Sequence, residues 1–526
     1  MERIATSFCS FETLVRRYTY VDKTDKLWRL VSDTEDRMFF LARPRRFGKS
    51  LMLDTLKCIF EGRRELFKGL KIEKRRYDWK KYPVVMLDMS KAKGETPGEL
   101  KGSLNALVDG IAATFALEID ATKPVGTRFG QALDALFEKH GQYVVLVDEY
   151  DVPLQGFLDD RSAIRRVRKL MHDFYVQLKS HSGDIRFMMM TGVTKLTKLS
   201  VFSGLNNPTD LTMDYPEYAG LLGYTPKEIE ATYPKRLDAF AKKLKTDRKG
   251  ALKRLLDWYD SYWFCPDSRV RVCNPISIAK ALRLAKLDSY WVRTAVSTLV
   301  MERIAAAGKT PADFEGCTAT KSELDLCDAM ELPAKSLMYQ SGYLTIKGVS
   351  KTEVDEIGNP KLVLGAPNHE VRGAIRAGWF DYFIKIPSTE FDALVDVANR
   401  QVAAGDLRGL VGESLYRVYA KIPPTWRIRS EADVKRHFRL FMEMLGAKVA
   451  AEEGSAFGYA DAIVETRKFV WVFEFKFNKS AKAAVRQIRE KGYAAQFKGD
   501  RRPVTLVGVN FSMAKRNIDE PLFAAL

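Results

Sequence analysis

The chain has 526 residues, 46% of them hydrophobic, so it is long enough to bury several cores and to form about three or four domains. Its 85 lysines and arginines exceed its 67 aspartates and glutamates, which gives a formal net charge of +18. This excess suits a polyanionic partner, with nucleic acid first, DNA before RNA, and an anionic membrane surface second. A basic composition that serves only solubility is the alternative.

The cysteines and the apolar runs exclude other classes. The six cysteines form no C-x-x-C pair and no cysteine–histidine spacing suited to zinc, so free thiols in a reducing compartment are expected. No run approaches the ~18 apolar residues of a membrane span. The N-terminal residues lack the apolar core of a signal peptide. These features predict a cytoplasmic protein without a membrane partner.

The first part of the chain, residues 1–235, alternates apolar runs with amphipathic segments. The runs cover residues 38–42, 83–88, 143–148 and 185–190. Near-continuous apolar strands separated by helices indicate a parallel sheet that is covered by helices on both faces. We therefore predict an α/β domain for residues 1–235.

The next part, residues 236–375, has a mostly helical periodicity. It ends in two β-rich runs at 342–346 and 361–364, which are expected to pair as a hairpin. Residues 376–410 have the pattern of a helical linker. These segments predict a middle region that is mainly helical, followed by a connection to a further domain.

The C-terminal part, residues 411–526, follows the order helix, strand, strand, helix, strand. Its strands are expected around residues 463–464, 470–473 and 504–509. This order predicts a second α/β domain. We find no internal repeat and no low-complexity segment in the chain.

Residues 43–50 read Arg-Pro-Arg-Arg-Phe-Gly-Lys-Ser and end in the pattern of a phosphate-binding loop. In such a loop the backbone amides cradle phosphates, the lysine reaches the β- and γ-phosphates, and the hydroxyl ligates Mg²⁺. Arg43 stands where the full pattern has its first glycine. The predicted ATP-binding residues of the loop are Arg45, Arg46, Phe47, Gly48, Lys49 and Ser50.

Acidic residues follow the apolar run at 143–148, at the strand end where open α/β sheets bind ligands. We predict that Asp148, together with Ser50, holds the Mg²⁺ of ATP, and that Glu149 is catalytic by polarising the attacking water. Thr191, after the run at 185–190, is a further ATP-site candidate. The alternatives are a solvated acidic turn and an ordinary small residue at a strand end.

Several short segments together resemble the AAA-ATPase-like family of P-loop ATPases. They are residues 20–24 (Tyr-Val-Asp-Lys-Thr), 43–50, 148–151 (Asp-Glu-Tyr-Asp), 191–195 (Thr-Gly-Val-Thr-Lys), 202–207 (Phe-Ser-Gly-Leu-Asn-Asn), 222–225, 274–275, 290–291, 342–345 and 367–371. In that family arginine commonly stands at the position of Arg43. The resemblance implies an ATPase core, a helical and winged-helix-like middle region, and often a C-terminal PD-(D/E)XK nuclease-like domain with a restriction-endonuclease-like fold.

Near the C-terminus, Asp461 precedes Glu474 by 13 residues, a spacing that allows one strand, a turn and a second strand. Both carboxylates are then able to converge, and two hard oxygen ligands suit Mg²⁺. Lys476 lies on the same strand face as Glu474 and is placed to orient the attacking water. We predict that Asp461, Glu474 and Lys476 are catalytic. The alternative is an exposed strand with an internal Glu/Lys pair.

The resemblance to the PD-(D/E)XK domain adds two residues. Asp433 occupies the position of the family's first acidic residue, which is usually glutamate, so the resemblance implies a third metal ligand there. Gln487 matches the glutamine helix that flanks the site. Tyr459 replaces the usual arginine before Asp461.

Together these features favour an ATPase module that regulates a C-terminal Mg²⁺-dependent nuclease acting on DNA or RNA. The alternative is a non-catalytic, ATP-dependent switch or scaffold whose C-terminal domain binds nucleic acid or protein without cleavage. A homo-oligomer is compatible with both interpretations.

Overall fold

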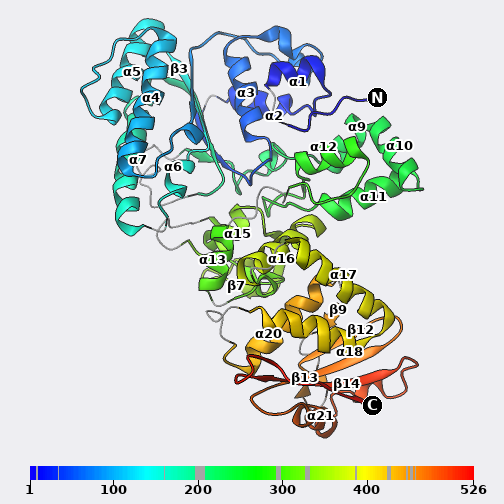
Figure 1. Cartoon of the computed structure of the whole chain (residues 1–526). Coiled ribbons are helices and arrows are strands. Elements are labelled where there is room, and N and C mark those ends of the chain that lie inside the picture. The colour runs from blue at the N-terminus through cyan, green and yellow to red at the C-terminus, as the bar shows by residue number, and fades with distance from the viewer. Residues whose placement is uncertain are drawn as a thin grey trace. The chain divides into compact units, whose positions relative to one another are not determined.

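The computed structural model describes most of the chain (Figure 1). The residues outside the description are 8–9, 34, 159, 196–207, 292–297, 308, 326–331, 385–387, 423–427, 446–447, 451–453 and 456–457. The chain divides into two compact units. The first comprises Met1–Ala295 with Phe314–Arg372, and the second comprises Val296–Asp313 with Gly373–Leu526.

The first unit is built on a parallel sheet with the strand order β2-β3-β4-β1-β5. Its strands are β1 (Met38–Ala42), β2 (Val84–Asp88), β3 (Tyr143–Asp148), β4 (Ile185–Gly192) and β5 (Thr209–Asp210). Each central strand is apolar along nearly its whole length, because helices cover both faces of the sheet. The predicted α/β fold of this part is therefore confirmed.

Helices lie on both sides of this sheet in Figure 1, with α3 on one side of β3 and α4, α5 and α7 on the other. Their bounds, with those of the shorter helices, are α1 (Phe11–Arg17), α2 (Thr24–Val31), α3 (Lys49–Phe60), α4 (Pro97–Phe115), α5 (Val125–His140), α6 (Val152–Gln155) and α7 (Arg161–Ser180). Side-chain caps mark several starts, since the Thr96 hydroxyl and the Asp160 carboxylate accept backbone N–H groups of α4 and α7.

The remainder of the first unit is helical and ends in a small antiparallel sheet with the order β6-β8-β7. Its helices are α9 (Pro226–Thr232), α10 (Pro234–Lys243), α11 (Arg248–Tyr259), α12 (Pro275–Leu284), α14 (Lys321–Asp325) and α15 (Ala334–Gln340). Its strands are β6 (Thr318–Ala319), β7 (Thr345–Val354) and β8 (Pro360–Gly365). The predicted hairpin is present, with Ile346 opposite Leu364.

The second unit contains a mixed sheet with the order β15-β14-β13-β12-β9, in which β16 also pairs with β14. The strands are β9 (Lys448–Ala450), β12 (Ala462–Glu465), β13 (Val470–Phe477), β14 (Val504–Ser512), β15 (Asn517–Ile518) and β16 (Leu522–Ala525); β10 (Gly454–Ser455) and β11 (Gly458–Tyr459) pair separately. β13 runs antiparallel to β12 and parallel to β14. This is the predicted C-terminal α/β domain.

The helices of the second unit are α13 (Thr298–Ala306), α17 (Ser388–Ala404), α18 (Leu407–Gly409), α19 (Tyr416–Ala420), α20 (Glu431–Met444) and α21 (Ala481–Glu490). α16 (His369–Ile384) begins in the first unit and ends in the second. On β13, Phe473 packs against Phe438 of α20, whereas Val472 packs in one cluster with Val485 of α21. Because side chains alternate along a strand, α20 and α21 cover opposite faces of this sheet.

No helix in the described part of the chain has the length and apolar character needed to cross a membrane. The subdivision into residues 1–235, 236–375, 376–410 and 411–526 remains a prediction.

Candidate nucleotide and metal sites

The phosphate-binding loop connects β1 to α3, and its geometry depends on Gly48. Gly48 has a φ of +96° and immediately precedes Lys49, the first residue of α3. Glycine adopts this left-handed conformation without steric cost. The free amides and the positive dipole end at the start of α3 therefore meet the loop, as an anion site requires.

Lys49 is folded back over the loop. Its Nζ donates to the carbonyl oxygens of Arg43 at 2.8 Å and Pro44 at 3.1 Å. Burial lowers the pKa of Lys49, and the carboxylates of Asp151 and Asp148 oppose that effect. The ammonium group thus lies inside the loop, where a phosphate oxygen would compete with the two carbonyl groups.

Arg43, at the position of the missing glycine, is a buried structural residue. Its Nη1 donates to the carbonyl oxygens of Ala42 at 2.8 Å and Thr212 at 2.9 Å. Its guanidinium carbon lies 4.3 Å from the centroid of the Phe264 ring. Burial lowers the pKa of Arg43 to about 10, so the group stays charged at neutral pH. The first glycine of the usual pattern is therefore replaced by a side chain that anchors the loop to its surroundings.

The acidic strand end is separated from the loop by one strand, because β4 lies between β1 and β3. Thr191 at the end of β4 donates its hydroxyl to Asp148 Oδ1 at 2.8 Å. Thr191 is fully buried, and Asp148 is 6% exposed. The structure therefore brings these two predicted residues together behind the loop rather than on its open side.

Glu149 lies on the open side and has an unusual backbone. Its φ is +52°, which is rare outside glycine, and its N–H donates to Asp148 Oδ1 at 3.0 Å. Burial raises the pKa of Glu149, and the Asp148 carboxylate raises it further. Arg46 in the loop also has a positive φ, of +67°. Strained backbone of this kind concentrates at functional sites.

A cavity of about 970 Å³ lies against the loop. Five of the predicted loop residues and Glu149 line it: Arg45, Arg46, Gly48, Lys49, Ser50 and Glu149. The Phe47 side chain does not line the cavity; it packs at 4.8 Å, centroid to centroid, against the ring of Tyr262. The predicted contribution of Phe47 to ATP binding is thus left to its backbone amide, because its ring faces Tyr262.

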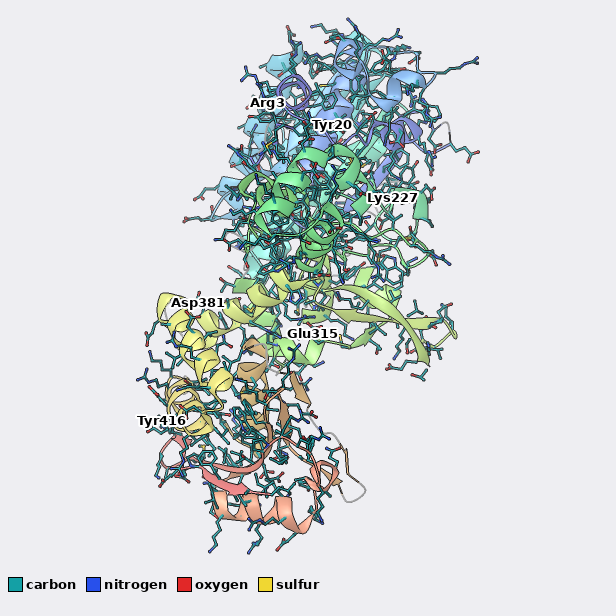
Figure 2. The ribbon with its side chains drawn as sticks, turned by 90° about the vertical axis from the view of Figure 1, so that its right-hand side faces the viewer. Arg3, Tyr20, Lys227, Glu315, Asp381 and Tyr416 are labelled. Carbon is teal, nitrogen blue, oxygen red and sulfur yellow. The ribbon has the colours of Figure 1, made fainter. Side chains whose placement is uncertain are left out.

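Sequence reasoning missed an aromatic and apolar part of the cavity lining. This part is formed by Tyr20, which Figure 2 labels, together with Tyr224, Tyr233 and Ile276. Tyr20 comes from the N-terminal segment, Tyr224 from the turn before α9, Tyr233 from the junction of α9 and α10, and Ile276 from α12. An aromatic and apolar wall of this kind suits a nucleotide base, whereas the loop end suits phosphates. The sequence signals were the family segments at residues 20–24, which includes Tyr20, and 222–225, which includes Tyr224.

The middle-region segments pack against the phosphate-binding loop. Trp291 donates its indole Nε1–H to the carbonyl oxygen of Arg45 at 3.2 Å, and its backbone N–H donates to Glu370 Oε1 at 2.6 Å. Glu370, in the first turn of α16, also accepts the Ser277 hydroxyl at 2.7 Å. Gly342 lies so close to Pro44 that an added Cβ would meet the proline ring at 2.7 Å. The segment at 202–207 lies outside the described residues.

The second candidate site lies at one end of β12 and β13. Carboxylate oxygens of Glu431, Asp461 and Glu474 all lie within 4.8 Å of one another. Lys476 Nζ donates to Glu474 Oε1 at 2.9 Å and to Glu431 Oε1 at 3.3 Å. Asp461 Oδ2 accepts the backbone N–H of Phe475 at 2.8 Å, which holds the loop-borne carboxylate against β13. The structure therefore brings Asp461, Glu474 and Lys476 together.

The protonation states in this cluster are shifted. Burial raises the pKa of Glu474 to about 7, and the nearby Asp461 carboxylate contributes to the shift. Burial likewise raises the pKa of Asp461. Burial by itself lowers the pKa of Lys476, but the hydrogen bond to Glu474 and the charge of Glu474 raise this pKa overall. Crowded buried carboxylates with a charged lysine are typical of functional sites.

Asp433 is not in the cluster; the acidic residue of α20 in it is Glu431. Asp433 Oδ2 accepts the Ser430 hydroxyl at 2.9 Å and the backbone N–H of Arg429 at 2.9 Å. Its carboxylate is thus used to cap the N-terminus of α20. The sequence contained this signal, because Ser430 followed three residues later by an acid fits a capping box.

Lys435 is a second residue that sequence reasoning missed. It follows Glu431 by four residues on α20, and its Nζ lies 2.5 Å from Asp461 Oδ1. The hydrogen bond to Asp461 raises the pKa of Lys435 against the effect of burial.

Gln487 lies on α21 and donates to the Tyr493 hydroxyl at 3.3 Å, and it does not belong to the carboxylate cluster.

Comparisons with known proteins match the two regions of the chain that contain these sites. A family model described as a predicted AAA-ATPase, AAA-ATPase-like, matches residues 6–202, and a PD-(D/E)XK nuclease superfamily model matches residues 429–521. An uncharacterized protein in the vnfD 5′ region of Azotobacter chroococcum mcd 1 is 30% identical over 516 residues, which span 95% of this chain and 94% of that protein.

Two solved structures were also matched. The ORC2 protein of Aeropyrum pernix, in ADPNP and ADP complexes, is 11% identical with a TM-score of 0.27, and the match covers 84% of this chain and 86% of that one. Cdc6p from Pyrobaculum aerophilum is 10% identical with a TM-score of 0.22, covering 72% and 95%. The family matches, the full-length relative and the two sites agree: the chain belongs to the AAA-ATPase-like family and carries a PD-(D/E)XK nuclease superfamily domain at its C-terminus.

Proposed function

We propose that this protein is a metal-dependent nuclease whose activity is controlled by ATP binding and hydrolysis in its N-terminal ATPase module. The observation that carries the proposal is the meeting of Glu431, Asp461 and Glu474 within 4.8 Å, with Lys476 bonded to Glu474. Metal-dependent phosphodiester hydrolysis uses carboxylates to hold the metal ion and a cationic group beside them.

The carboxylate cluster fits a divalent cation such as Mg²⁺. Glu474 is 1% exposed, and its Oε2 has no hydrogen-bond partner among the described residues. A buried carboxylate oxygen without a partner is costly, and a cation would satisfy it. Glu431, Asp461 and Glu474 would hold the ion. When bound, Mg²⁺ supplies Lewis-acid stabilisation of phosphate charge and makes a water molecule more acidic.

The two lysines have different tasks in this proposal. Lys476 stays protonated because it pairs with Glu474, so it is able to donate hydrogen bonds to a phosphate oxygen or to orient a water. Lys435 pairs with Asp461. Because a metal ion at the cluster would compete for Asp461 Oδ1, Lys435 would act as a counter-ion that the metal displaces.

The nucleotide site supports ATP as the controlling ligand. Lys49 and the N-terminus of α3 would hold the phosphates, Ser50 and Asp148 would hold the accompanying Mg²⁺, and Glu149 would orient the attacking water. The buried Asp148 lies behind the open loop, so its contact with the ion would run through water. Thr191 fixes the Asp148 carboxylate through its 2.8 Å hydrogen bond.

Control by ATP means that nucleotide binding changes the free energy of the nuclease-competent state by a few kcal/mol. We expect nucleic acid as the substrate, because the chain carries a net charge of +18. Within this class we propose DNA ahead of RNA. The thiols of Cys58, Cys265 and Cys273, which form no disulfide among the described residues, fit a cytoplasmic location. Association into a homo-oligomer is compatible with this scheme.

The test is a nuclease assay on DNA and RNA substrates with Mg²⁺ or Mn²⁺, with and without ATP. Asp461→Ala is expected to abolish metal-dependent cleavage while ATP turnover continues. Lys49→Ala is expected to abolish ATP turnover and the effect of ATP on cleavage. Wild-type cleavage by Asp461→Ala contradicts the nuclease assignment, and unchanged ATP turnover by Lys49→Ala contradicts the nucleotide site.

A non-catalytic switch is the competing function, and the two ion pairs Lys435–Asp461 and Lys476–Glu474 favour it, because each lysine partly compensates the charge of its carboxylate. That function is favoured if the protein leaves every substrate intact with either metal and yet binds nucleic acid with a steep dependence on salt.

A further inference from the structure

Helix α7 carries a basic face that neither candidate site uses. Its apolar residues, including Ile164, Met171 and Phe174, are buried. On the other side, Arg161, Arg165 and Lys169 are exposed. These three follow one another at intervals of four residues and therefore form one row along the helix.

The basic row borders a hollow of about 330 Å³. Among the described residues, this hollow is lined by Arg165, Arg168, Lys169 and His172. All four are basic side chains, and all come from two adjacent turns of α7. A hollow with such a lining favours an anionic ligand, because the arginine and lysine cations reinforce one another's positive potential.

Only part of this charge is neutralised within the helix, where His172 Nδ1 lies 3.3 Å from Asp173 Oδ1. Arg165 and Lys169 have no carboxylate within ion-pair distance among the described residues, and like charges four residues apart slightly destabilise a helix. Asp160, the nearest acid before the row, accepts the backbone N–H groups of Ser162 and Ala163. A locally unfavourable arrangement of this kind is expected where binding compensates for it.

The dimensions fit a nucleic acid backbone. From Arg161 to His172 the helix advances about 16 Å, and the same length of double helix presents roughly ten phosphate charges. The face lacks what an anionic membrane surface would engage, because none of the exposed large hydrophobic side chains recorded for the described residues belongs to α7.

We propose that the basic face of α7 and its hollow bind the phosphodiester backbone of a nucleic acid, so that the ATPase unit itself contacts the polyanion. This inference rests on the proposed function only for the identity of the polyanion. It adds a contact surface on a helix that, in chain order, follows β3 and precedes β4. β3 ends at Asp148, and β4 carries Thr191.

The test removes two charges without disturbing the core. Arg165→Gln/Lys169→Gln in the full chain is compared with Lys249→Gln/Lys253→Gln, which removes two exposed lysines, also four residues apart, from α11. Binding to fluorescein-labelled duplex DNA, single-stranded DNA and RNA is measured by anisotropy across a range of KCl. EDTA is present and ATP is absent, so neither cleavage nor nucleotide control enters the result.

The slope of log affinity against log salt is negative, and loss of two phosphate contacts makes it shallower by about 1.8. For each protein we take the dissociation constant at about 200 mM KCl divided by that at about 50 mM. Relative to the parent, this ratio is about tenfold smaller for the α7 variant and unchanged for the α11 variant. The three nucleic acids show which backbone is preferred. Equal slopes for the α7 variant and the parent overturn the proposal, as does an equal loss in both variants.

A vesicle measurement separates the membrane alternative. Sedimentation with phosphatidylserine–phosphatidylcholine vesicles is expected to be the same for the parent and the α7 variant. If the α7 substitutions abolish vesicle binding and leave nucleic acid binding intact, the surface is a membrane contact and the proposal is wrong. Thermal unfolding of both variants checks that the exposed substitutions leave the fold unchanged.

Discussion

The hydroxyl of Thr191 donates to Asp148 Oδ1 at 2.8 Å, and it connects the ends of two neighbouring parallel strands behind the phosphate-binding loop. The contact exists because β4 lies between β1 and β3. It fixes the orientation of a carboxylate that has only 6% of its surface exposed.

Replacement of Thr191 by valine is expected to reduce ATP turnover by about tenfold to a hundredfold, since a hydrogen bond to a charged group contributes about 1.5–3 kcal/mol. Steady-state phosphate release measures the effect. Thr191→Ser keeps the hydroxyl and should retain most of the activity. Equal losses in the two variants would show that the methyl group, rather than the hydrogen bond, matters.

Restoring the usual glycine of the loop, Arg43→Gly, is expected to destabilise the protein by about 2–4 kcal/mol. The substitution removes a buried guanidinium with two hydrogen bonds and a cation–π contact to Phe264. Chemical denaturation of the first unit measures the change, and substitution of the exposed Arg64 by glycine is the control. A more stable Arg43→Gly protein would contradict the structural role.

Trp291→Phe is expected to weaken nucleotide binding by about fivefold, because it removes the indole hydrogen bond to the Arg45 carbonyl, worth about 1 kcal/mol. Titration with a fluorescent ATP analogue measures the dissociation constant. Trp258→Phe, at a tryptophan that packs in the cluster of α10, α11 and α12, is the matched variant and should bind normally. If the two variants weaken binding equally, loop support by Trp291 is not the cause.

Glu431→Gln and Asp433→Asn distinguish the two acidic residues at the start of α20. If Glu431 is a ligand, its amide variant should lose metal-dependent cleavage and most of the Mn²⁺ affinity measured by calorimetry. Asp433→Asn should instead lower the melting temperature slightly, because Asp433 caps the helix. The reverse pattern would restore the original prediction of Asp433 as the ligand.

The stability of the metal-free protein should depend on Glu474. Burial raises the pKa of Glu474 to about 7 from its ordinary 4.5, so the folded state binds the proton more tightly than the unfolded state. The resulting stability is fully present below pH 4.5 and is lost as the pH rises through about 7. In EDTA, the melting temperature of the parent should therefore fall more than that of Glu474→Gln over this range; parallel curves would contradict the shift.

The sequence alone determined most of the local structure. The four apolar runs of the first part became β1 to β4, because uninterrupted apolar strands are stable only inside a covered parallel sheet. Gly48, Lys49 and Ser50 lie at the start of α3 because the motif is a contiguous segment whose turn and helix form locally. The spacing of Asp461, Glu474 and Lys476 likewise follows from one hairpin.

Tertiary structure decided what joins segments that are distant in the chain. The strand order, which places Thr191 against Asp148, and the approach of Trp291 and Glu370 to the loop depend on packing over long separations, which no local pattern encodes. The same holds for which acidic residue of α20 joins the carboxylate cluster. Glu431 and Asp433 both lie in the first turn of α20. Only the folded domain shows that Asp433 accepts a backbone N–H group while Glu431 lies close to the other carboxylates.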